Sequence, residues 1–179
     1  YEPEVPSVHV VTDDHVLERD DWLRDATSVL EAGGSSIALH VRGRRTHGAT
    51  LFRLATTLLR ESQRTRGWIV VNDRVDVGLA CGAGAIHLGS RSLPIDVVRG
   101  LVDEGTRIGV SCHARDDVAR ARSGGADYAF VGTVFSSSTH PDESGIGVEG
   151  LKDASRGSGL WPVIGIGGID VARAGSVTA

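Results

Sequence analysis

The chain has 179 residues, of which 40% are hydrophobic and 23% charged, and its formal net charge is −4. This composition predicts a single globular domain, residues 1–179, without a nucleic-acid partner or a membrane span. The two cysteines, Cys81 and Cys112, lie far apart without metal-type spacing, which predicts free thiols in a reducing compartment and a cytoplasmic location.

Short runs of β-branched and apolar residues alternate along the chain with segments of helical period. Seven such runs predict strands, over Val8–Thr12, Ile37–Val41, Trp68–Val71, Ala85–Leu88, Ile108–Val110, Tyr128–Val131 and Pro162–Ile166. The segments between them predict helices, which begin near Asp20, Ala49, Val75, Leu93, Asp116 and Gly150, with a last one after Asp170. This alternation predicts βα units and a parallel sheet, and a barrel or an open doubly wound sheet both fit it.

Polar residues follow the carboxyl ends of these strands, where α/β proteins bind their ligands. In chain order they are Thr12-Asp13, His40 with Arg42 and Arg44, Asn72-Asp73, His87, Ser111 with His113, the loop Ser136–His140, and Gly167-Gly168. Arginine suits bidentate phosphate contacts, and a Gly-Gly turn that opens a helix offers backbone N–H groups to an anion. Taken singly, each could be a solvated turn, a helix cap or a core residue. Taken together, they predict a phosphorylated small molecule as ligand.

Motifs in a characteristic order give the chain a family resemblance. They are VNDRVDV at 71–77, IHLG at 86–89 followed by Leu93-Pro94, GVSCH at 109–113, GADY at 125–128, GTVF at 132–135 and IGIGGI at 164–169. In these motifs the chain resembles the thiamine-phosphate synthase/TenI superfamily. The resemblance implies a TIM (β/α)8-type barrel from which the eighth strand and helix are absent, a role in thiamine biosynthesis, and thiazole phosphate as a ligand.

Resemblance to the synthase implies one set of site residues. That enzyme joins a pyrimidine pyrophosphate to thiazole phosphate and uses Mg²⁺ on the pyrophosphate. The resemblance implies a metal ligand at Asp73 and substrate-binding roles for Arg42, Arg44 and Asn72. The position of the synthase's second metal aspartate holds Ser92, a weak ligand for a hard cation, and the position of a lysine in the loop after the sixth strand holds His140.

Resemblance to TenI implies different chemistry. TenI-type proteins bind a carboxythiazole phosphate and shift a proton to form its aromatic tautomer, which needs acid/base groups and no metal. His40 matches the TenI form of its motif, while the TenI histidine after the sixth strand is Thr133 here. We expect a TenI-like thiazole tautomerase with His140 and His40 as catalytic residues and no cofactor. The alternatives are the synthase, with Mg²⁺, and a non-catalytic binder of thiazole phosphate or thiamine phosphate.

The remaining expectations concern ligands and partners. We expect phosphate to be bound by Ser111, Ser137, Thr139, Gly167 and Gly168. The expected partners are the small phosphorylated thiazole and, for a synthase, the pyrimidine pyrophosphate, with a homo-oligomer compatible with the sequence. A phosphosugar isomerase or epimerase would instead need a catalytic Asp or Glu at the ends of the second and seventh strands, where His40 and Gly167 stand.

Overall fold

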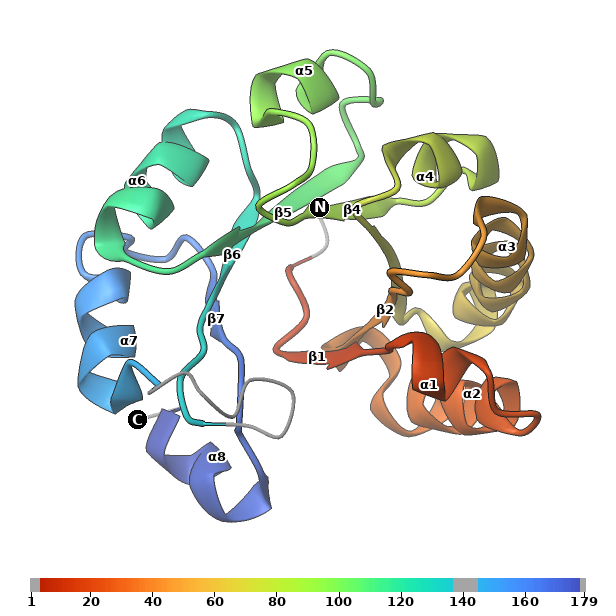
Figure 1. Ribbon diagram of the computed structural model, residues 1–179, viewed down its shortest axis with the longest axis horizontal. Coiled ribbons are helices and arrows are strands. Elements are labelled where there is room, and N and C mark those ends of the chain that lie inside the picture. The colour runs from red at the N-terminus through yellow and green to blue at the C-terminus, as the bar shows by residue number, and fades with distance from the viewer. Residues whose placement is uncertain (1–3, 137–144, 178–179) are drawn as a thin grey trace. The chain divides into compact units, whose positions relative to one another are not determined.

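The computed structural model describes residues 4–136 and 145–177 (Figure 1). The chain divides into two compact units, Tyr1–Arg107 and Ile108–Ala179, each of which is described by itself. Both units consist of parallel strands joined through helices. The prediction of a single domain over 1–179 stays a prediction.

The first unit contains four parallel strands that pair in chain order. The strands are β1 (Val8–Val11), β2 (Ile37–Val41), β3 (Trp68–Asn72) and β4 (Ala85–Leu88). The helices are α1 (Asp14–Leu17), α2 (Trp22–Gly33), α3 (Gly48–Thr65), α4 (Val75–Cys81) and α5 (Ile95–Arg99), with a short 3₁₀ turn over Gly34–Ser36. Figure 1 shows α2, α3 and α4 along one side of these strands.

The strands of the first unit have an apolar face toward the helices. Because side chains alternate along a strand, Leu39 and Val41 of β2 point to one face and Ala38 and His40 to the other. Leu39 and Val41 pack with Ile69 of β3 and with the buried sides of the helices in the main core cluster. Ala38 belongs to a small separate cluster on the other face of the sheet, away from the helices, which we call the inner face. The sheet of the first unit therefore has a large apolar core on its helix side, while its inner face can hold polar side chains.

Helix α3 contributes to that core through apolar residues that recur at helical spacing. Leu51, Ala55 and Leu58 are all buried, with at most 1% exposed. The helix ends at Arg66, whose left-handed conformation (φ 63°) lets its N–H donate to the carbonyl of Ser62. The chain then enters β3 at Trp68, and pairing with β2 and β4 sets the register of that strand.

The second unit contains three parallel strands, which also pair in chain order. They are β5 (Arg107–Cys112), β6 (Tyr128–Val131) and β7 (Val163–Gly165), and the helices are α6 (Arg115–Ser123), α7 (Gly147–Ser155) and α8 (Val171–Val177). Strand β6 is buried over its whole length. Strand β7 is only partly buried, and no residue of α8 is fully buried.

Most predicted elements are confirmed, and the differences have local causes. The seven parallel strands and the alternating helices agree with the predicted α/β class, and the described residues contain no eighth strand. Helix α1 was not predicted, because four residues carry too little periodicity to identify it. Cys81 and Cys112 are free thiols, as expected. No helix in the described part of the chain is long and apolar enough to cross a membrane.

We expect Leu58→Ala to destabilise the first unit by about 3 kcal/mol, because truncating a fully buried leucine leaves a cavity in the core. Leu79→Ala, at a side chain that is 45% exposed, is the control and should change stability little. Urea unfolding of both variants measures the difference. Equal midpoints for the two would contradict the assignment of Leu58 to the core.

Candidate functional site

A layer of polar side chains lies on the inner face of the first unit, further along the strands than the small apolar cluster that includes Ala38. His40 on β2 is fully buried, and His87 on β4 is 2% exposed. Their rings lie 5.5 Å apart, edge to face. Asn72, at the end of β3, is in register with His87 and lies 2.8 Å from the Nδ1 atom of His40. His9 on β1 lies 2.8 Å from the Nε2 atom of His40. Four strands thus bring three imidazoles and one amide together.

Burial keeps these imidazoles neutral. It lowers the pKa of His9 to about 4 and that of His87 to about 3, because a charged ring would lose its hydration. The pKa of His40 is also well below the usual value, first because of burial and then because of repulsion from His87 and His9. A ring that resists protonation this strongly carries protons poorly at neutral pH. The role of His40 as an acid/base catalyst stays a prediction, and this environment does not favour it.

Asp73 follows the polar layer at the carboxyl end of β3. Its left-handed backbone (φ 60°) turns the chain sharply out of the strand, and its N–H donates to the carbonyl of His87. Its Oδ1 atom accepts hydrogen bonds from the Gly89 N–H (3.0 Å) and the Ser92 hydroxyl (2.7 Å). In the described part of the chain, hydrogen bonds reach only Oδ1, so Oδ2 is available to a cation. The loop after β4 thus holds the carboxylate in place.

The loop after β2 carries Arg42 and Arg44, and a carboxylate fixes its backbone. Asp14, at the start of α1, accepts hydrogen bonds from the N–H groups of Arg44, Arg45 and Thr46 and from the Thr46 hydroxyl, at 2.8–3.0 Å. Burial would raise the pKa of Asp14, but these hydrogen bonds together lower it. The short helix α1 therefore has a structural reason: it presents one carboxylate to four donors.

Thr12 anchors the base of the same loop. Its hydroxyl donates to the carbonyl groups of His40 and Arg42 and accepts from the N–H of Arg42 (2.9 Å). Arg42 is half-buried, and its charge adds a small contribution to the lowered pKa of His87, which burial mainly causes. Arg44, by contrast, is exposed. The first unit therefore brings together the predicted residues His40, Arg42, Asn72 and Asp73 at one edge of its sheet, and it holds the backbone of Arg44 beside them.

The second unit holds another set of predicted residues at its own strand ends. His113 donates from Nδ1 to the carbonyl of Gly132 (2.8 Å), and Asp117 caps α6 by accepting from the N–H groups of His113 and Ala114. Ser111 is half-buried near the end of β5.

Gly167 and Gly168 form a turn between β7 and α8 that requires glycine. Both have positive φ, 99° and 62°. A Cβ atom at Gly168 would meet the carbonyl oxygens of Phe135 and Ser136 at 2.6 Å. The turn is therefore packed tightly against Phe135 and Ser136 in the segment that follows β6. The predicted residues Ser137, Thr139 and His140 lie outside the described residues.

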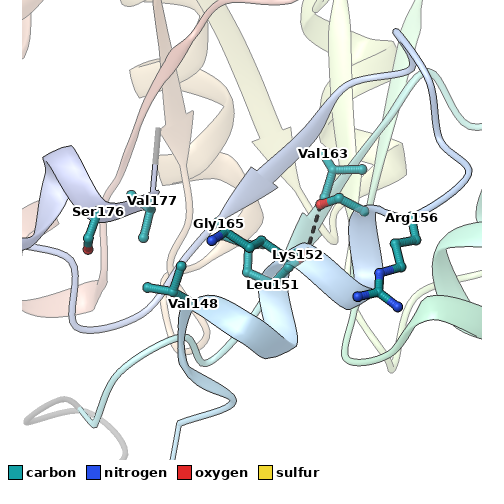
Figure 2. A pocket seen from close by; sticks show the side chains of 9 residues that line it. Val148, Leu151, Lys152, Arg156, Val163, Gly165, Ser176 and Val177 are labelled. Carbon is teal, nitrogen blue, oxygen red and sulfur yellow. Dashed lines mark hydrogen bonds between the residues drawn. The ribbon is translucent and has the colours of Figure 1, made fainter. Parts of the chain in front are cut away.

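A cavity of about 320 Å³ opens between α7, β7 and α8 of the second unit (Figure 2). Figure 2 shows Lys152 of α7, and Arg156 directly after that helix, beside apolar side chains such as Leu151 and Val163. None of these residues stands in a motif that the sequence marks as functional. In the part of the chain that the structure describes, no group of three or more His, Cys, Asp or Glu could hold a metal ion.

Sequence reasoning missed His9 and Asp14. His9 stands between valines in a short strand, where it resembles an ordinary alternating residue, and only pairing with β2 brings it to His40. Asp14 lies next to Asp13 in an acidic pair, and its four donors are some thirty residues away along the chain. The only signal in the sequence was that His9, like His40, is a histidine within a predicted strand.

Comparison with known proteins gives matches along nearly the whole chain. The profile of the family described as "Thiamine monophosphate synthase" matches residues 8–179. A thiamine-phosphate synthase from Clostridium tetani is 30% identical over 166 residues, which cover 92% of this chain and 77% of that protein. The "Thiamine biosynthetic bifunctional enzyme TH1, chloroplastic" of Arabidopsis thaliana is 33% identical over 99% of this chain, which spans only 34% of that longer protein.

A solved structure agrees with the sequence matches. Thiamine phosphate pyrophosphorylase from Pyrococcus furiosus superposes with a TM-score of 0.80 and 28% identity, over 96% of this chain and 80% of the other. This likeness confirms the predicted α/β fold of TIM-barrel type, of which the chain supplies seven βα units. The names of these relatives favour the synthase alternative over the predicted tautomerase.

We expect Asp14→Asn to destabilise the protein by about 1–3 kcal/mol at neutral pH. The NH₂ group of asparagine cannot accept hydrogen bonds, so some of the four N–H and O–H groups that Asp14 accepts from would lose their partner. The folded-state pKa of Asp14 is lowered, so its carboxylate stabilises the fold above the unfolded pKa. That contribution disappears as the pH falls through the folded pKa, and the two proteins should then converge.

Urea unfolding at neutral and at acidic pH measures this difference. Asp20→Asn, at an exposed aspartate before α2, is the control and should match the parent at both pH values. An Asp14→Asn variant as stable as the parent at neutral pH would show that the carboxylate does not fix the loop.

Proposed function

The chain belongs to the thiamine monophosphate synthase family, and on that premise we propose that it joins a pyrimidine pyrophosphate to a thiazole phosphate with release of pyrophosphate. The observation that carries this proposal is the arrangement of residues at the carboxyl ends of β2 and β3 in the first unit. There Arg42 and the backbone of Arg44 lie on one loop and Asp73 on the next strand end, each fixed by hydrogen bonds to a neighbouring element. Two guanidinium groups and one oriented carboxylate suit a substrate that carries a pyrophosphate.

In this reaction the bond between the pyrimidine methylene carbon and a pyrophosphate oxygen breaks. The electron pair leaves with the pyrophosphate, and the thiazole nitrogen forms a new bond to that carbon. Negative charge therefore grows on the leaving group, and fixed cations next to it lower the barrier. Arg42, held by Thr12 at the base of its loop, is our candidate for the nearer cation, and the exposed Arg44 for the outer one.

The family's use of Mg²⁺ can be tested against the donors present. Asp73 offers Oδ2, and the Ser92 hydroxyl lies 2.7 Å from its Oδ1. Mg²⁺ commonly takes one or two protein carboxylates, with waters and substrate phosphate oxygens completing its shell. A single carboxylate and a hydroxyl fit that pattern, with Asp73 as the residue that would hold the ion and Ser92 beside it. When bound, Mg²⁺ would neutralise charge on the pyrophosphate.

For the thiazole phosphate, the Gly167-Gly168 turn of the second unit remains our candidate, together with Ser111, Ser137 and Thr139. Consecutive glycines with positive φ can turn backbone N–H groups toward an anion without side chains in the way. The tight fit of Gly168 against the carbonyl groups of Phe135 and Ser136 supports a turn whose shape is fixed before a ligand arrives.

A tautomerase is the second candidate, favoured by the concentration of histidines in the first unit. It would need an acid/base group with a pKa near neutrality. The pKa values of His9, His40 and His87 are all lowered by burial, so these rings suit hydrogen bonding better than proton transfer. His140 stays the candidate acid/base for this reaction.

We expect Asp73→Asn to reduce formation of thiamine phosphate roughly hundredfold, because it removes the charge of the carboxylate while keeping its shape. Asp76→Asn, three residues further along and 66% exposed, is the matched control and should keep parental activity. Both are assayed with Mg²⁺ and with EDTA. Parental activity in Asp73→Asn, or full activity of the parent in EDTA, would contradict this role of Asp73.

The phosphate proposal is tested at Gly168 with two substitutions of equal size. Gly168→Asn and Gly168→Asp both add a side chain of the same shape at φ 62°, but only the second adds a negative charge. We expect Gly168→Asp to bind thiazole phosphate at least tenfold more weakly than Gly168→Asn, because like charges repel. Isothermal titration measures both. Equal affinities would place the phosphate elsewhere.

A further inference from the structure

An unbroken series of hydrogen bonds crosses the inner face of the first unit, from β1 to β3. It starts at the carbonyl of Pro6, which lies 2.9 Å from His9 Nε2. It continues from His9 Nδ1 to His40 Nε2 (2.8 Å) and from His40 Nδ1 to the side-chain amide of Asn72 (2.8 Å). All four ring nitrogens are engaged, so the hydrogens in this series can be counted.

Each of the three contacts needs one hydrogen. The carbonyl of Pro6 can only accept, so His9 must donate from Nε2. A neutral His9 then has a lone pair on Nδ1, which requires His40 to donate from Nε2. A neutral His40 in turn has a lone pair on Nδ1, and it needs a donor in Asn72. Two neutral rings supply two hydrogens, and the third must come from the amide.

The Asn72 amide has two orientations, related by a half-turn of its end group. If Oδ1 is the atom 2.8 Å from His40 Nδ1, the series lacks one hydrogen and the pair of rings would have to carry a positive charge. His40 is fully buried, and a charged ring there would be costly. Burial also lowers the pKa of both His9 and His40. The opposite orientation, with Nδ2 toward His40, satisfies all three contacts without charge.

We propose that His9 and His40 are positioning residues that hold Asn72 with its amide nitrogen toward His40, so that its Oδ1 faces the substrate as a hydrogen-bond acceptor. The direction of these hydrogen bonds is set at Pro6, whose carbonyl cannot donate. The two rings then transmit that direction to Asn72. Asn72 immediately precedes Asp73, at the edge where the candidate pyrophosphate site lies. Its orientation therefore decides which part of a substrate it can recognise.

This inference rests on the proposed function for the identity of the ligand. Ionised pyrophosphate oxygens only accept hydrogen bonds, so Asn72 Oδ1 would not bind them. An amino group on the pyrimidine ring is a donor of the right kind. The structure thus assigns to Asn72 the recognition of an aminopyrimidine, and to His9 and His40 the task of keeping its oxygen available.

Nuclear magnetic resonance of the ¹⁵N-labelled parent protein tests the series itself. Correlations between ring nitrogens and carbon-bound protons distinguish the two neutral tautomers from the imidazolium. We expect both His9 and His40 in the Nε2–H form at neutral pH, with a through-hydrogen-bond coupling between His40 Nδ1 and the Asn72 Nδ2 atom. An Nδ1–H tautomer or an imidazolium at either ring would overturn the proposal, whatever the enzyme does.

Kinetics test the positioning role. His9→Phe removes the acceptor for His40, and we expect the KM for the pyrimidine pyrophosphate to rise about tenfold with little change in kcat. His9→Gln, whose oxygen can again accept from His40, should restore most of the affinity. His15→Phe, at an exposed histidine of α1, is the control and should match the parent. For a pyrimidine pyrophosphate that lacks the amino group, parent and His9→Phe should differ little.

The outcomes separate the two proposals. A parental KM in His9→Phe, or an equal rise in KM with the analogue, would overturn the assignment of Asn72 to the amino group. A parent protein that forms no thiamine phosphate would contradict the proposed function, and the tautomers would still show whether the series has the direction inferred here. If His9→Phe fails to fold, the tautomers of the parent protein decide the matter.

Discussion

The contact between His40 and its two hydrogen-bonding neighbours governs the inner face of the first unit. A fully buried imidazole must satisfy both of its nitrogens within the protein, because water does not reach it. His9 and Asn72 supply those partners from the strands on either side, and thereby fix the positions of β1 and β3 relative to β2 on that face. The next residue along β3 is Asp73. The hydrogen bonds that buried His40 requires therefore also constrain the position of Asp73 at the edge of the sheet.

The sequence carries enough information for the elements, because their signals are local. Helix α4 begins at Val75, where the spacing of apolar residues predicts a helix start. Helix α1 escapes such reasoning. Its existence depends on Asp14 meeting the loop of Arg44–Thr46, and no local pattern encodes a contact across that distance.

The candidate site could be predicted only in part, for the same reason. Arg42, Asn72 and Asp73 stand in recognisable motifs directly after strands, so their shared edge follows from the parallel sheet. The depressed pKa of His40 depends on how deeply the finished fold buries it, and the partnership of His9 depends on strand register. The choice of reaction came from relatives, because the histidines of the sequence suggested proton transfer until their burial was known.

The position of Lys152 has a practical consequence. It is the one lysine in the sequence, it stands on α7 with about half of its side chain exposed, and it lines the cavity between α7, β7 and α8 (Figure 2). Apart from the chain's own amino terminus, an amine-directed dye or crosslinker therefore has a single attachment point. A fluorophore placed there would report on the second unit from a defined location, with no mutation needed to introduce it.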